Sequence, residues 1–148
     1  MFEKITLREK CCEEAKERIQ NFRENRHSVL NLNRLKLDSL EHLLSPQDMV
    51  IMKGLKCHHN RLFELPCYLN NVKYIDCSQN YIRIFPLLDH VLVLKCSHNP
   101  LEVLPDAPNL ECIECYETPV QDILYSMTRD DLLAKYPYLK KLNEHFIQ

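Results

Sequence analysis

The chain has 148 residues, a formal net charge of −2 and a single glycine. Its length fits one modest domain, and its near-neutral charge excludes a general affinity for nucleic acid or membranes through charge alone. Because phosphate-binding loops of the P-loop and dinucleotide-binding types need several glycines, one glycine excludes both.

No apolar run in the sequence approaches the roughly 20 residues that a transmembrane helix needs, so we expect no membrane span. The first residues are charged and lack the apolar core of a secretory signal. We therefore expect a protein that is made and folds in a reducing cytosol, with export into a host cell by a signal-less route as the alternative.

Residues 1–26 are expected to form an N-terminal capping helix, with the helical pattern running over 3–26. Apolar side chains recur there at helical spacing, charged residues lie between them, and glycine and proline are absent. A repeat protein exposes its apolar core at the first repeat, so a helix is needed to cover it. The alternative is a helix presented to a partner. The apolar positions are Ile5, Cys12, Ala15, Ile19 and Phe22.

Residues 27–124 carry about five copies of one pattern. The stretches 72–86 and 91–105 superpose when one is moved along the chain, and both read apolar, apolar, Cys, Ser, Asn, apolar, apolar, Pro. Apolar residues alternate with cysteines at period two, which predicts a short strand with one buried face in each copy. The first copy, 27–51, is irregular, and Ser45-Pro46 predicts a short helix inside it.

Two side-chain columns are expected to run through the repeats. Asn60, Asn80 and Asn99 should turn inward at the strand ends and form a hydrogen-bonded ladder with neighbouring backbone. Four cysteines at one repeat position should be reduced and buried, since free cysteine behaves as a small apolar residue. They are Cys57, Cys77, Cys96 and Cys115. Cys112-x-x-Cys115 has zinc-like spacing, but it is one pair without a second, so no metal or cofactor is expected.

Residues 125–148 are expected to form a C-terminal helical cap. Thr128 and Asp131 predict a helix start, and Pro137 should end that helix. We expect a second helix from Tyr138, because apolar residues then recur at helical spacing. They are Leu139, Leu142, Phe146 and Ile147.

These elements predict an α/β solenoid: a leucine-rich-repeat horseshoe segment with a parallel concave sheet, an N-terminal helical cap and a C-terminal helical cap. Over roughly 28–124 the pattern resembles the short-repeat leucine-rich proteins that Gram-negative bacterial pathogens export. The matching residues are Leu65-Pro66, Phe85-Pro86 and Leu104-Pro105, with Asn60, Asn80 and Asn99. The chain departs from them in having few repeats, cysteine where leucine is usual, and no ubiquitin-ligase domain. The resemblance implies an effector-like protein that binds a protein of the host or of the same organism.

Exposed strand positions alternate with buried ones and form rows across such a sheet, and they combine aromatic and charged residues as protein interfaces do. The candidate partner-binding residues are Lys56, His58, His59, Tyr74, Asp76, Gln79, Val93, Lys95, His98, Glu114 and Tyr116. We interpret the concave face as a protein-binding surface that occludes or inhibits its partner, with an enzyme as one candidate class of partner. The alternatives are an adaptor that docks through its N-terminal helix or convex edge and, less well supported, a nucleic-acid binder. The middle of the chain is basic, but the last repeat is acidic, at Glu111, Glu114 and Glu117.

A catalytic site is an alternative hypothesis, because His58, His59 and His98 fall near Cys112, Asp76 and Ser78 on the expected sheet. A nucleophile and its base need hydrogen-bond reach, and no oxyanion loop or pocket accompanies these residues. Zinc binding by His58 and His98 is not expected, because the sequence offers no further ligands beside them. The sequence therefore predicts a binding protein and not an enzyme.

Overall fold

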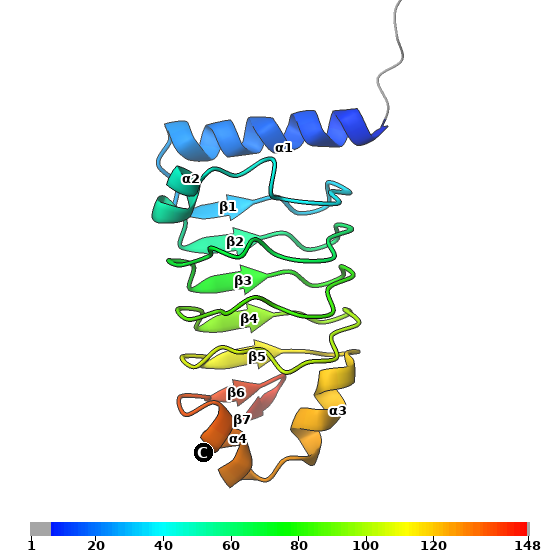
Figure 1. Cartoon of the computed structure of the whole chain (residues 1–148), viewed down its shortest axis with the longest axis vertical. Coiled ribbons are helices and arrows are strands. Elements are labelled where there is room, and N and C mark those ends of the chain that lie inside the picture. Colours follow the sequence, from blue (N-terminus) through cyan, green and yellow to red (C-terminus); the bar gives the residue numbers. More distant parts are fainter. Residues whose placement is uncertain (1–6, 148) are drawn as a thin grey trace, which may run out of the picture.

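The computed structural model of the chain describes residues 7–147 and shows short strands stacked in chain order between terminal helices (Figure 1). The elements are α1 (Leu7–Glu24), β1 (Val29–Asn31), α2 (Pro46–Ile51), β2 (Gly54–Lys56), β3 (Tyr74–Asp76), β4 (Val93–Lys95), β5 (Cys112–Glu114), α3 (Pro119–Ser126), α4 (Arg129–Lys135), β6 (Lys141–Leu142) and β7 (His145–Phe146). Within 7–147, no helix is both long and apolar enough to cross a membrane.

The strands form one sheet of seven in the order β1 to β7, parallel from β1 to β6 and antiparallel between β6 and β7. Its register aligns Leu55 with Ile75, Ile75 with Leu94, and Leu94 with Ile113, which confirms the frame read from the sequence. These four side chains are almost completely buried. Stacking the repeats therefore creates a core that a single repeat could not form.

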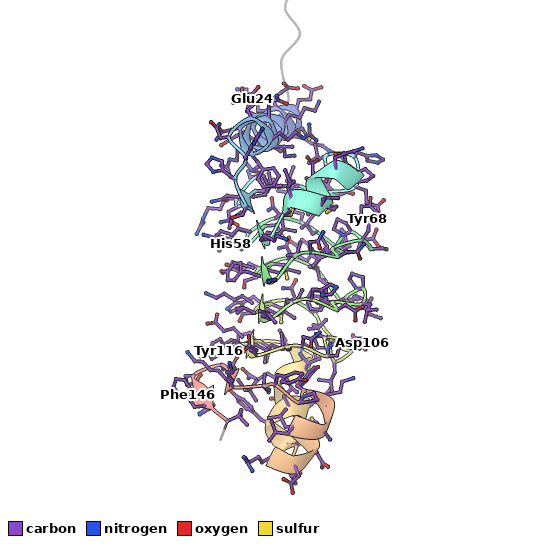
Figure 2. The ribbon with its side chains drawn as sticks, turned by 90° about the vertical axis from the view of Figure 1, so that its left-hand side faces the viewer. Glu24, His58, Tyr68, Asp106, Tyr116 and Phe146 are labelled. Atoms are coloured by element: carbon purple, nitrogen blue, oxygen red, sulfur yellow. The ribbon has the colours of Figure 1, made fainter. Side chains whose placement is uncertain are left out.

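The return segments from β2 to β5 contain no helix, as the short repeats predict. A step of 19 or 20 residues leaves no room for one, and Pro66, Pro86 and Pro105 favour extended backbone instead. Figure 2 shows the two sides of the stack: His58 and Tyr116 project from the strand side, and Tyr68 and Asp106 lie on the return side. Two faces of different character therefore run the length of the molecule.

An asparagine ladder joins successive turns inside the stack. The Asn80 amide donates to the carbonyl oxygens of Cys57 and Cys77 at 3.0 and 2.9 Å, and its Oδ1 accepts from the Leu62 N–H at 2.9 Å. Asn60 and Asn99 make the equivalent bonds in their repeats. Each amide thus satisfies backbone groups of two repeats at once, which couples neighbours across the core.

The four repeat cysteines form a fully buried column of free thiols, as predicted. Burial raises the pKa of each thiol, to about 11 for Cys115. The thiols of Cys77 and Cys96 donate to carbonyl oxygens of the following strand, at 3.5 and 3.3 Å. Because the thiolate is the reactive form, a buried thiol with a raised pKa is inert.

We expect thiol modification to divide the cysteines by burial. Cys67 is exposed and should react at once with Ellman's reagent, whereas the four column thiols should react only after the chain unfolds in guanidinium. Cys67→Ser should remove the fast phase and leave the protected thiols unchanged. Rapid reaction of more than four thiols in the native protein would contradict the buried column.

Helix α1 lies across the first repeat, where it covers the end of the core as predicted (Figure 1). Its own side chains Ala15, Ile19 and Phe22 are buried. Ile5, which was also predicted as an apolar position of this helix, lies outside the described residues. The predicted start of α2 is also confirmed, since Ser45 is its N-cap and Pro46 its first residue. Asp48 completes a capping box there.

The C-terminal region differs from the prediction in two ways. Helix α3 was not predicted; it begins where Thr118 takes the asparagine position of the repeat and caps the helix by accepting from the Gln121 N–H. The prediction of a second helix from Tyr138 was wrong, because residues 141–146 form the β6–β7 hairpin. The spacing of Leu139 and Leu142 fits a helix, but it also fits the apolar spacing of the repeat. Backbone pairing of β6 with β5 selects the strand. The start of α4 at Thr128 is as predicted.

Candidate functional site

The exposed side chains of β1–β5 and of the second and third residues after each strand form one surface, which we call the sheet face. Its first row is Asn31, Lys56, Asp76, Lys95 and Glu114, and its second is Val29, Gly54, Tyr74, Val93 and Cys112. The rows follow the alternation of exposed and buried strand positions that the sequence predicts. Gly54 is buried because the Val29 side chain lies over it, with a methyl carbon 3.1 Å from where a Cβ would stand.

Tyr74 and Val93 lie side by side at the middle of the sheet face, and both are half-buried. The Lys95 ammonium lies 5.9 Å from the centre of the Tyr74 ring, within the range of a cation–π contact. Next to them is a hollow of about 240 Å³ whose lining includes Val93, Lys95, Cys112, Glu114 and Lys141. The centre of the face therefore combines apolar area with charges of both signs.

A further row at the strand ends consists of residues with left-handed backbone. Arg34, His59, Gln79, His98 and Glu117 have φ between 52° and 60°. The backbone N–H groups of the first four residues each donate to a carbonyl oxygen of the next repeat. The His59 N–H, for example, donates to the Ser78 carbonyl oxygen at 3.0 Å. This conformation repeats in every turn, so it presents the row at one edge of the sheet face. The left-handed backbone itself was not predicted, because none of the five residues is glycine.

His58 and His59 interact directly, with their Nδ1 atoms 2.6 Å apart, so one nitrogen donates and the other accepts. Burial lowers the pKa of His59, and so do the charges of Arg34, His58 and His98, while Asp76 acts in the opposite direction. The neutral form of His59 is therefore favoured at this edge, where cations outnumber carboxylates.

Tyr116 is exposed, but its hydroxyl donates to the Glu144 carboxylate in the turn between β6 and β7. This hydrogen bond is the main cause that raises the pKa of Tyr116 to about 12. The hairpin also supplies Asn143, which is buried and accepts from the Cys115 N–H at 2.7 Å. The hairpin thus extends the sheet face beyond the last predicted repeat. Leu139-x-x-Leu142 was the sequence signal for it, because it repeats the spacing of Leu110 and Ile113.

The groups weighed for catalysis do not come together as a catalytic set. Cys112 begins β5 level with Val93, whereas His98 lies beyond the far end of β4, where its N–H donates to the Tyr116 carbonyl. Across 7–147 there is no group of three or more His, Cys, Asp or Glu side chains placed to hold a metal ion. The structure therefore holds Cys112 and His98 apart on the sheet face.

Parallel three-residue strands at a step of 19 or 20 residues, each followed by an inward Asn or Thr, define the leucine-rich-repeat fold. Among solved structures, the chain matches one described as a Shigella effector LRR domain, with a TM-score of 0.67 and 26% sequence identity. The match covers 88% of this chain and 54% of that chain, so this chain spans about half its length. No protein-family model and no curated protein matches the chain. The chain thus has the leucine-rich-repeat fold and resembles the LRR domain of a bacterial effector.

Proposed function

We propose that this protein binds another protein through the sheet face and occludes a functional surface of that partner. The observation that carries the proposal is the centre of the face, where Tyr74 and Val93 are half-exposed beside Lys95 and Asp76. Aromatic anchors with a charged surround are typical of binding hot spots. The similarity to an effector LRR domain supports the same class of function.

These side chains are not needed to hold the sheet together. The strands pair through backbone hydrogen bonds, and the buried contacts come from the alternate residues, such as Ile75 and Leu94. A surface that can vary without loss of the fold is suited to recognition. An interface of about 800 Å² on each partner is the usual size for a specific complex.

Replacing Tyr74 by Ala together with Lys95 by Glu should weaken partner binding at least about tenfold, since a tenfold change is about 1.4 kcal/mol and hot-spot residues commonly contribute more. The measurement is affinity capture followed by titration of the captured protein, beside wild type. The matched control is Tyr138→Ala with Lys135→Glu, which makes the same chemical changes at exposed C-terminal positions. A partner that binds the Tyr74/Lys95 variant with unchanged affinity would exclude the sheet face as its site.

The return side offers a second candidate, an adaptor that docks by its convex edge. The return segments contain apolar residues that are more than half exposed, namely Phe63, Ile84, Leu87 and Val103. Retention of the partner by the Tyr74/Lys95 variant would favour this surface. Docking by α1 is less well supported, because Ala15, Ile19 and Phe22, which form its main apolar face, are already buried.

A further inference from the structure

Beside the proposed centre, the strand-end edge contains a hollow of about 580 Å³. This edge lies on the right of Figure 1, where the chain leaves each arrow. The side chains that line the hollow are Lys36, His59, Arg61, Gln79, Tyr81 and His98, together with the ladder residues Asn60 and Asn80. Lys36, Arg61 and Tyr81 were not among the candidate residues read from the sequence.

The lining is cationic and contains no carboxylate. Lys36 and Arg61 are exposed, and within 7–147 neither side chain forms an ion pair with Asp or Glu. The carboxylate closest in sequence to Lys36, that of Asp38, is bound to Arg8 at 3.0 Å. Unpaired cations around one hollow create a positive potential that a negatively charged ligand can neutralise.

One wall of the hollow is aromatic. The Tyr81 ring stacks on Phe63 with ring centres 5.6 Å apart, and the Tyr81 side chain remains about half exposed, at 52%. Stacking already restricts both rings, so the Tyr81 side chain loses little further conformational freedom when a ligand contacts it. A charged site with a rigid apolar wall is suited to a peptide, whose side chains combine both characters.

We propose that this hollow binds a carboxylate-rich segment of the partner protein. The inference rests on the proposed function, because it specifies the chemistry of one part of that partner. Nucleic acid fits less well, since the cations do not continue as a track: the positions that follow Lys36, Arg61 and Tyr81 in later repeats are prolines, and Glu117 ends the adjacent row.

The test uses a short fluorescein-labelled peptide of alternating Glu and Gly, with fluorescence anisotropy at low and at physiological salt. Wild type should bind it, and added salt should weaken the binding. Lys36→Glu with Arg61→Glu should weaken binding by about tenfold or more, because both reversals replace attraction with repulsion. A Gln/Gly peptide should bind neither protein.

The matched control is Arg129→Glu with Lys135→Glu, which makes the same change in net charge at exposed positions of α4. It should bind the acidic peptide as wild type does, and circular dichroism should show that both variants are folded. An equal loss in the control, or no binding by wild type at low salt, would overturn the proposal. So would tighter binding of a single-stranded oligonucleotide of equal charge.

The Tyr74→Ala, Lys95→Glu variant separates this inference from the proposed function. Neither of its side chains lines the hollow, so it should keep most of the affinity for the acidic peptide. If the Lys36/Arg61 variant loses neither the peptide nor the captured partner, the inference fails while the sheet-face proposal remains. If the Tyr74/Lys95 variant keeps the partner but the Lys36/Arg61 variant loses it, the centre of the sheet face is excluded instead.

Discussion

Replacing Asn80 by Ala should lower the free energy of unfolding by about 4 kcal/mol, since each buried polar group left unpaired costs about 1–3 kcal/mol. The substitution removes the acceptor of the Leu62 N–H and the donors to two carbonyl oxygens, and Asn80 is only 5% exposed, so water cannot replace them in place. Domains of this size are stable by about 5–15 kcal/mol, so the loss is a large fraction of the total. The measurement is urea denaturation followed by circular dichroism.

Two further variants define the cause of that loss. Asn80→Asp keeps the shape and the acceptor but not the amide donors, so it should also be strongly destabilised. Asn70→Ala makes the original change at an exposed residue and should alter stability by less than about 0.5 kcal/mol. Similar midpoints for Asn80→Ala and Asn70→Ala would show that the ladder contributes little.

Replacing Asp48 by Ala should destabilise the N-terminal cap by about 3 kcal/mol, from the loss of a charge-assisted pair and a capping box. Asp48 is 2% exposed and accepts two hydrogen bonds from the Arg23 guanidinium, at 2.7 and 2.6 Å, and one from the Ser45 N–H at 2.8 Å. This figure is below that of a fully buried ion pair because the Arg23 side chain is 40% exposed and partly screened.

The same pair makes stability depend on pH. Burial alone would raise the pKa of Asp48, but the hydrogen bonds from Arg23 and Ser45 outweigh it and hold the pKa below its usual value. A carboxyl whose folded pKa is depressed stabilises the fold above its unfolded pKa of about 3.9, and that contribution is lost as the pH falls through the folded pKa. The stability gap between wild type and Asp48→Asn should therefore be constant near neutral pH and shrink below about pH 4.

Urea denaturation at several pH values measures this gap. The control is Asp89→Asn, an exposed carboxylate outside the described ion pairs, which should give little gap at any pH. A gap for Asp48→Asn that stayed constant into strong acid would show that the Arg23 contact adds nothing to stability.

The repeats could be predicted because each buried position recurs. Leu55, Ile75 and Leu94 occur in the same frame, so one alignment determines strand, register and the faces of the sheet. The start of α2 was also readable, because capping by Ser45 and Asp48 is local chemistry. Local and periodic signals therefore account for most of the fold.

The regions that were missed depend on contacts between distant residues. Leu139 and Leu142 suit a helix and a strand equally, and only the pairing of Lys141 with Cys112 selects the strand. The basic hollow was missed for a related reason, since Lys36 and Arg61 are far apart in sequence and meet only through stacking of their turns. A single sequence does not distinguish these outcomes.

The antiparallel β7 strand limits how the molecule can grow. A further parallel repeat cannot join the sheet in register beyond β7, because β7 runs against the direction of the other strands. Between β3 and β5, in contrast, the 19-residue step recurs, so a duplicated unit could enter there without disturbing either end. Each such duplication would lengthen the sheet face by about 4.8 Å. Repeat expansion in the middle of the chain would therefore change the reach of the binding surface while both caps remain the same.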